Sequence, residues 1–272
     1  GAVTPVAVMD PASVGGTTVR HATLHNLDEI KRLGVKIGDT VILEKAGDVI
    51  PKIVQVLLKL RTGKEKEIHA PTACPACGTR LVRPEGEVAI SCQNKKCPAK
   101  DKERMIHFVS KKAFNMDGLG VKIIEQLMDE GLVSAPADLF RLTKEDLVDL
   151  ERFAEKSATN VVDEIKSRKE IELSRFIYAL GIKHVGEETA YDLAKHFGTL
   201  NHLMDSSKED LAKISNIGEV VAESVAEFFG DKKNRDEIQG LIHVGVHVKP
   251  EQKKAVNPKI AGKTFVITGS LD

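Results

Sequence analysis

All four cysteines of the chain lie in one short window, at Cys74, Cys77, Cys92 and Cys97. The spacing C-x2-C-x14-C-x4-C can bring four thiolates to the corners of a tetrahedron, which is the geometry of a structural Zn²⁺ site. Two disulfides or free thiols are the alternatives, and the lack of a recognisable secretory signal peptide or transmembrane run disfavours disulfides. Because four thiolates leave no position for a catalytic water, the predicted zinc stabilises a fold and performs no chemistry.

The formal net charge is zero, but the two parts of the chain differ in charge. Residues 1–104 carry 17 Lys and Arg against 12 Asp and Glu, a balance of +5, and the remaining 168 residues carry 23 against 28, a balance of −5. The basic part suggests an anionic partner. The scarcity of aromatic residues, with no Trp, argues against binding of single strands by ring stacking and favours several small domains over one large core.

The N-terminal residues predict a small β domain. One short helix is expected over residues 26–33 with Asn26 as its N-cap, and Pro51 indicates an edge strand or a bulge. Short strands with one helix are typical of a small Greek-key barrel of the OB type. The four β-rich runs, which are separated by glycine turns, are residues 2–9, 19–24, 40–43 and 49–60.

From residue 101 onward the apolar period is helical, and a helix-hairpin-helix pattern occurs four times. Three hairpins are rich in glycine, and a weaker copy occupies Glu151–Ala154. Alignment on Gly120, Ala154, Gly186 and Gly218 gives steps of 34, 32 and 32 residues. In three of the four units a small residue that permits close helix packing follows four positions later, at Ala158, Ala190 and Ala222.

Each hairpin ends at a helix N-terminus, where main-chain N–H groups are unpaired and the helix dipole is positive. Glycine lets a phosphate approach these amides, so the pattern predicts contacts with the DNA backbone that read no sequence. Plain hairpin turns in a helical bundle are the alternative. The candidate DNA-binding residues in the hairpins are Gly118, Leu119 and Gly120, Gly181, His184, Val185 and Gly186, and Asn216, Ile217 and Gly218.

This order of modules resembles bacterial NAD⁺-dependent DNA ligase. Residues 19–26 and 46–51 match the OB domain of that family, residues 181–186 match its third hairpin, and residues 262–269 match the first strand of its BRCT domain. The resemblance covers nearly the whole chain. The implied organisation is an OB fold over residues 1–72 with a first strand that is expected to be incomplete, a four-cysteine zinc finger over 73–100, an all-α helix-hairpin-helix domain with four repeats over 101–248, a linker over 249–258 and the truncated start of a BRCT domain over 259–272.

The resemblance implies part of a bacterial, cytoplasmic and nucleoid-associated enzyme that uses NAD⁺ and Mg²⁺ to seal nicks in duplex DNA during replication and repair. The family forms its lysine–AMP intermediate at a Lys-x-Asp-Gly motif, but the one Asp-Gly here, Asp117-Gly118, has Asn115 in the position of the lysine. We therefore expect these residues to hold no catalytic group, to bind double-stranded nicked DNA as a monomer away from membranes, and to depend on the adenylation domain of the same polypeptide.

The resemblance also implies contacts in the OB domain. Val49 and Ile50 are expected to pack into the minor groove beside the nick, and Lys45 is expected to neutralise a phosphate. The second hairpin has Arg152 and Ala154 in place of glycines, so it is expected to be structural, with a weak phosphate contact at best. Arg20, His25 and Asn26 are further candidates, with a polar barrel rim as the alternative. The rival function is a non-enzymatic DNA-repair adaptor or the DNA-binding arm of an excision nuclease.

Overall fold

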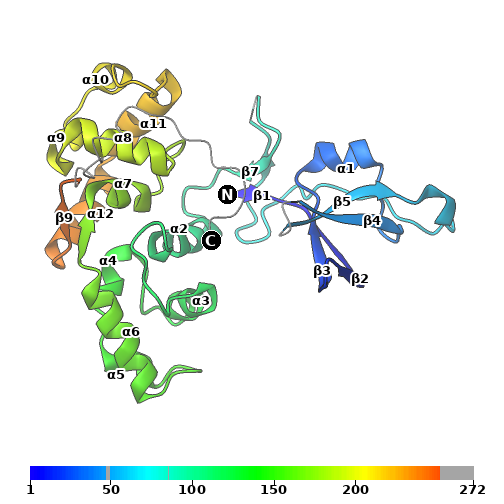
Figure 1. Cartoon of the computed structure of the whole chain (residues 1–272), viewed down its shortest axis with the longest axis horizontal. Coiled ribbons are helices and arrows are strands. Elements are labelled where there is room, and N and C mark those ends of the chain that lie inside the picture. Colours follow the sequence, from blue (N-terminus) through cyan, green and yellow to red (C-terminus); the bar gives the residue numbers. More distant parts are fainter. Residues whose placement is uncertain (47–49, 85, 252–272) are drawn as a thin grey trace, which may run out of the picture. The chain divides into compact units, whose positions relative to one another are not determined.

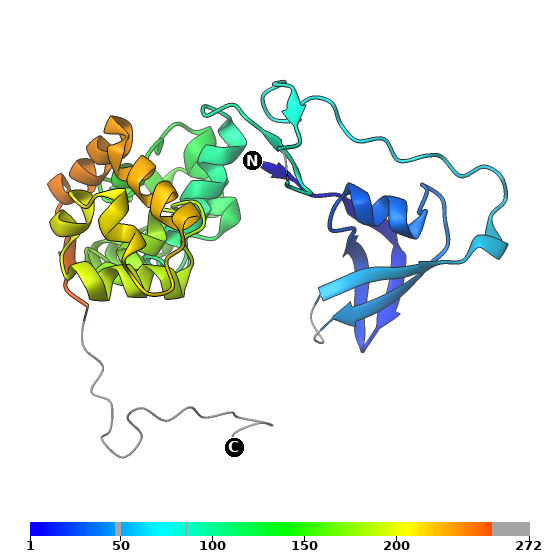
Figure 2. The same cartoon turned by 90° about the horizontal axis from the view of Figure 1, so that it is seen from above.

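The computed structural model describes residues 1–46, 50–84 and 86–251, which form two compact units (Figures 1 and 2). The first unit is Gly1–Asp101 and the second begins at Lys102, so the boundary falls inside helix α2 (Pro98–Val109). The predicted BRCT strand and the candidate Val49 lie outside the described residues. No helix in the described ranges has the length and the apolar character that a membrane crossing requires.

The first unit is built on a four-stranded sheet in the order β2-β3-β5-β4. Neighbouring strands are antiparallel except β3 and β5, and register shifts interrupt both antiparallel ladders. Its apolar core includes Ala22, Leu24, Ile30, Ile53 and Val56, consistent with the predicted OB type. The elements of this sheet domain are β2 (Val6–Val14), β3 (Thr17–Thr23), α1 (Leu27–Leu33), β4 (Val41–Ala46), β5 (Ile50–Val56) and a short 3₁₀ helix, η1 (Leu58–Leu60).

Helix α1 begins as the sequence predicted. The Asn26 side chain accepts a hydrogen bond from the Glu29 amide at 2.9 Å, which satisfies one of the free donors of the first turn. The helix ends at Gly34, whose φ of 62° is the left-handed conformation that glycine adopts without strain. The predicted N-cap is therefore confirmed, and Asn26 has a structural role.

The single strand predicted over residues 2–9 is divided in two. Strand β1 (Ala2–Val3) pairs with β7 (Ile90–Cys92), which in turn pairs with β6 (Leu81–Val82) to form a second, three-stranded sheet around the cysteines. The break falls at Thr4-Pro5, because proline has no N–H to donate to a ladder. The first residues of the chain therefore belong to the zinc finger sheet, and β2 starts the OB sheet.

An ion pair between Arg61 and Asp39 links two segments of the OB domain. The Arg61 guanidinium donates to both carboxylate oxygens of Asp39 at 2.7 Å and to the Gly34 carbonyl at 2.6 Å. The Asp39 side chain is only 1% exposed and also accepts from the Lys36 amide. The hydrogen bond from Arg61 lowers the pKa of Asp39 below its ordinary value. This pair therefore joins the segment that leaves the barrel to the turn before β4.

We expect Arg61→Met to lower the unfolding midpoint of the first unit by about 5 °C or more, because it leaves a buried carboxylate with one main-chain donor. The depressed pKa of Asp39 means that the contribution of the pair is complete above the unfolded pKa of about 3.9 and is lost as the pH falls through the folded value. Thermal unfolding followed at pH 7 and pH 3 measures both effects. Arg32→Met is the matched control, since its pair with Glu29 is exposed; equal shifts in the two variants contradict the assignment.

The second unit is helical, with one two-stranded parallel sheet formed by β8 (Glu170–Glu172) and β9 (His247–Lys249). In Figure 1, α5 and α6 lie at one end of this unit and α10 and α11 at the other. The helices that follow α2 are α3 (Val121–Asp129), α4 (Pro136–Leu139), α5 (Lys144–Val148), α6 (Glu155–Ser167), α7 (Leu173–Ala179), α8 (Glu187–Phe197), α9 (Leu200–Met204), α10 (Lys208–Ala212), α11 (Glu219–Gly230) and α12 (Lys232–His243).

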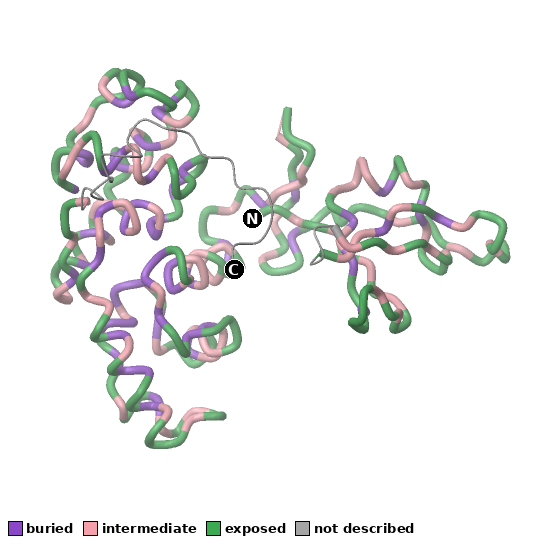
Figure 3. The backbone as a smooth tube through the Cα atoms, in the orientation of Figure 1, coloured by how far each residue is buried: buried purple, intermediate pink, exposed green. Residues whose placement is uncertain are grey.

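Buried residues alternate with exposed ones along these helices, as one amphipathic face of each turns inward (Figure 3). The rings of Phe108 and Phe114 stack with centroids 4.2 Å apart, and the Phe140 ring meets Phe114 edge-on. The small residues that the repeat predicted, Ala158, Ala190 and Ala222, are completely buried. Each lies one turn into the second helix of its unit, where a larger side chain would hold the packed elements apart.

Candidate functional site

The four cysteine sulfurs form one cluster in which all Sγ atoms lie within 4.8 Å of one another. Cys74 and Cys97 Sγ are 3.8 Å apart, and Cys77 and Cys92 Sγ are 3.5 Å apart. A disulfide needs about 2.05 Å, whereas four sulfurs at about 2.3 Å from a central zinc lie about 3.8 Å from one another. The spacing fits tetrahedral zinc, and the predicted ligand set is brought together in full.

Main-chain geometry positions these ligands. The Gly78 amide donates to the Cys74 carbonyl at 2.9 Å, and Gly78 has a φ of 70°, so glycine suits the turn that carries the first pair. Cys92 lies at the end of β7, and its amide donates to the Gly1 carbonyl. Cys97 directly precedes α2, and its carbonyl accepts from the Lys100 and Asp101 amides of that helix. The site thus joins the N-terminal strand, the zinc finger sheet and α2.

The thiols differ in electrostatic environment. The hydrogen bond between the Cys77 sulfur and the Thr79 hydroxyl, 3.3 Å apart, lowers the pKa of Cys77 to about 6. Burial raises the pKa of Cys92 to about 11, because the thiolate loses its hydration. Bound Zn²⁺ supplies the positive charge that lets all four sulfurs stay ionised near neutral pH. Zinc binding therefore releases protons and weakens as the pH falls.

All four hairpins of the second unit share one turn. In each, the amide of one apolar residue donates to the carbonyl three residues earlier, over distances of 3.1–3.4 Å. The third residue of each turn has a positive φ, which together with this bond is the pattern of a type II turn. The four positive-φ residues are Gly118 (85°), Arg152 (73°), His184 (65°) and Asn216 (74°).

The apolar residues of these turns face inward. Leu119, Val185 and Ile217 were candidates for DNA contact, but at most 9% of each residue is exposed. Their side chains anchor the turns to the helical core, so any contact that they make with DNA would involve the main chain. Gly181 lies at the C-terminal end of α7 with a φ of 66°, and a Cβ there would meet the His107 ring at 3.6 Å. Gly181 therefore has an evident structural role.

The glycines that end three of the hairpins are exposed, unlike the buried apolar residues before them. Gly120, Gly186 and Gly218 are the N-caps of α3, α8 and α11, with no side-chain cap at any of them. All three are exposed, and a Cβ built on any of them meets no atom within 4 Å. The first amides of these helices have no intrahelical acceptor, so an anion can reach them. In the second hairpin the N-cap residue is Ala154, and its amide donates to the Ser157 hydroxyl at 2.8 Å.

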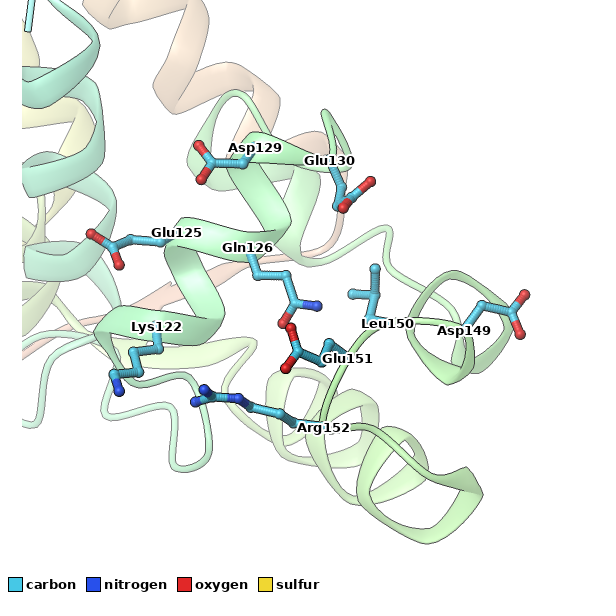
Figure 4. Close-up of a pocket in the computed structure, with 9 residues that line it drawn as sticks. All are labelled: Lys122, Glu125, Gln126, Asp129, Glu130, Asp149, Leu150, Glu151 and Arg152. Carbon is cyan, nitrogen blue, oxygen red and sulfur yellow. The ribbon is translucent and has the colours of Figure 1, made fainter.

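Contacts within the second unit bring three hairpins close together. Lys112, which precedes the first hairpin, forms an ion pair with Glu187, the first residue of α8 after the third hairpin. Arg175 of α7 donates to the carbonyls of Lys111 and Ala113 at 2.6–2.9 Å. A groove of about 560 Å³ separates α3 from the second hairpin (Figure 4). The first hairpin thus adjoins both the second and the third.

Two cations line the same groove, and the sequence analysis did not predict that they would be close to each other. Lys122 lies in the first turn of α3 and Arg152 in the second hairpin, and both side chains extend to the same end of the groove (Figure 4). The residue types alone gave no signal of their proximity. The other lining residues are Glu125, Gln126, Asp129, Glu130, Asp149, Leu150 and Glu151.

The OB candidates are distributed over the first unit. The Lys45 ammonium donates to the Gly15 carbonyl at 3.4 Å, so it lies against the β2–β3 turn. Ile50 begins β5 and is 56% exposed, as an apolar contact residue must be. His25 is exposed with a φ of 54°, and its amide donates to the Thr23 hydroxyl at 3.0 Å. Arg20 is exposed on β3.

Comparison with known families matches each module. A model described as NAD-dependent DNA ligase OB-fold domain matches residues 1–65, and one described as NAD-dependent DNA ligase C4 zinc finger domain matches residues 73–99. A SAM-like helix-hairpin-helix tandem matches residues 112–167, and a helix-hairpin-helix motif matches residues 175–238. The cysteine cluster is therefore a C4 zinc finger, and the hairpins fall into two tandem pairs.

Two curated relatives cover the whole chain. A protein named DNA ligase from Halothermothrix orenii is 48% identical over 275 residues, and one of the same name from Syntrophotalea carbinolica is 48% identical over 271 residues. The chain spans 41% and 40% of the length of these relatives. The family, the zinc finger and the hairpins that these comparisons identify are those that the sequence analysis predicted. The chain belongs to the NAD-dependent DNA ligase family, of which it contains the OB-fold domain, the C4 zinc finger and the helix-hairpin-helix repeats.

Proposed function

We propose that this chain is the DNA-clamping part of an NAD⁺-dependent DNA ligase and that it holds nicked duplex DNA without reading its sequence. The observation that carries the proposal is the set of exposed, uncapped helix N-termini at Gly120, Gly186 and Gly218, presented by turns of one conformation. Main-chain amides at such positions bind phosphate oxygens, and phosphates carry no base information.

The charge distribution supports the same function. The part of the chain that contains the hairpins has more acidic than basic residues, so a broad positive field is not the source of its affinity. Local amides bind a phosphate without adding side-chain charge. In the OB domain, the exposed Ile50 offers an apolar contact for a distorted minor groove, while Lys45 offers a single cation beside it.

The chemistry of sealing belongs to other parts of the whole enzyme in this proposal. The 272 residues contain no Lys-x-Asp-Gly motif, and the chain spans about 40% of the length of its relatives. An adenylation domain of the same polypeptide would use NAD⁺ to activate a lysine, and the joining step would use Mg²⁺. The present residues would orient the nick as part of a monomeric enzyme on the bacterial nucleoid.

Fluorescence anisotropy with labelled nicked duplexes of two unrelated sequences tests the proposal. We expect equal affinities for the two sequences and a binding constant that falls with salt, because phosphate contacts release counterions. An affinity that is independent of salt, or a strong preference for one sequence, contradicts the proposal. The adaptor and nuclease alternatives are less well supported, since both the OB and the zinc finger models are specific to NAD-dependent ligases.

A further inference from the structure

The second hairpin has the turn of the other three, but the amide of its N-cap residue has a partner within the protein. The Ala154 amide donates to Ser157 Oγ at 2.8 Å, and that hydroxyl donates back to the Ala154 carbonyl at 2.9 Å. The N-cap amide of α6 is thus used inside the protein, while the first turn of the helix has no side-chain cap. This hairpin therefore offers an anion one main-chain donor fewer than the glycine hairpins do, and side-chain charge is the further means by which it could hold one.

Arg152 is the unusual residue of this hairpin. Its φ of 73° is a left-handed conformation that a side chain with a Cβ rarely adopts, and the equivalent position of the first hairpin is Gly118. The Arg152 side chain does not stabilise this conformation from within the protein, because no hydrogen bond or ion pair joins it to another of the described residues. An exposed cation held in a strained turn suggests an external partner.

Lys122 is the second cation at this end of the groove. It lies two residues after Gly120, is exposed, and has no ionic or hydrogen-bonding partner within the described part of the chain. Five carboxylates line the same groove as these cations. Asp129 and Glu130 lie at the other end of α3, and Glu125 pairs with Lys102 at 3.5 Å (Figure 4). Lys122 and Arg152 therefore lie at the hairpin end, with the Glu151 carboxylate beside Arg152, and Asp129 and Glu130 lie away from them (Figure 4).

This distribution of charge in the groove limits the kind of anion that can bind to the two cations. A small polyanion that entered the groove would meet five carboxylates, whereas a strand that crosses only the hairpin end would meet two cations and the Glu151 carboxylate, a net positive charge. A DNA backbone that follows the first hairpin satisfies this condition. We propose that Arg152 and Lys122 each neutralise a DNA phosphate, so that side-chain charge from the second hairpin and from the start of α3 adds to the main-chain amides of the glycine hairpins. The inference rests on the proposed function and extends it to the hairpin that sequence reasoning treated as structural.

The test is the slope of log K against log salt concentration for binding to a nicked duplex. Removal of one phosphate contact lowers the magnitude of this slope by about 0.9, and removal of two by about 1.8. Arg152→Gly and Lys122→Gln are therefore expected to lower it singly and additively, and Arg152→Lys is expected to preserve it. Arg152→Gly is informative because glycine suits the turn, so its unfolding midpoint should equal or exceed that of the parent chain.

Arg141→Gln is the matched control, since the Arg141 guanidinium is already paired with Asp138 outside the groove. Its slope should equal that of the parent. If Arg152→Gly and Lys122→Gln keep the parent slope while Gly186→Asp weakens binding, this inference is wrong and the clamping function stands. If the parent chain itself shows no salt-dependent binding, the clamping function is wrong as well.

Discussion

Replacement of Cys92 with serine is expected to abolish zinc binding and to unfold the zinc finger sheet. Cys92 is 2% exposed and lies on β7, the strand that pairs with both β1 and β6. Structural zinc contributes about 10–16 kcal/mol of apparent binding free energy at pH 7, which is folding free energy for a module this small. Elemental analysis should find about one zinc per parent chain and almost none in the variant.

Hydrogen exchange locates the effect. Amides of β1, β6 and β7 should lose protection in Cys92→Ser, while those of the second unit should keep it, since Met105, Phe108 and the other buried residues of that unit form a separate core. Ser91→Ala changes the neighbouring residue, which is not a ligand, and should retain zinc. A Cys92→Ser protein with full zinc content would contradict the four-thiolate site.

Replacement of Gly186 with aspartate should weaken DNA binding about ten- to hundredfold without lowering stability. The N-cap backbone (φ −89°, ψ −176°) is extended and the Cβ position is open, so aspartate fits. Its carboxylate can cap the first amides of α8, which favours the helix. The same carboxylate occupies the donors and repels the phosphate, with the loss of one or two charge-assisted hydrogen bonds.

Opposite effects on affinity and on unfolding midpoint distinguish this result from simple damage. Gly230→Asp is the control, because it introduces the same charge at a site where the Cβ is also unobstructed but which lies at the end of α11, outside any hairpin. Its affinity should match that of the parent chain. Unchanged affinity in Gly186→Asp would mean that the third hairpin does not contact DNA.

Features defined by local spacing could be predicted from the sequence. The four-cysteine cluster, the period of the hairpins and the Asn26 cap all involve residues that are close along the chain or repeat at a fixed interval. The ligase resemblance followed from the same local motifs, and the comparisons support it. The BRCT strand, the role of Val49 and the DNA contacts remain predictions.

Other features depended on partners that sequence reasoning could not identify. Strand 2–9 divided because residues 2–3 pair with a strand almost ninety positions away. The apolar hairpin residues, which were assigned to DNA contact, are anchors whose burial depends on the helices packed behind them.

The sequence by itself determined the modules and the hairpin period, because metal spacing, capping and helical periodicity are short-range properties. The tertiary structure alone decided that Arg152 adopts the conformation that Gly118 has in the first hairpin and that its side chain shares a groove end with Lys122. A left-handed φ at arginine contradicts its intrinsic preference and is maintained by the turn, in which the Phe153 amide donates to the Leu150 carbonyl at 3.1 Å. The proximity of two side chains thirty positions apart is set by the packing of helices, which no local pattern specifies.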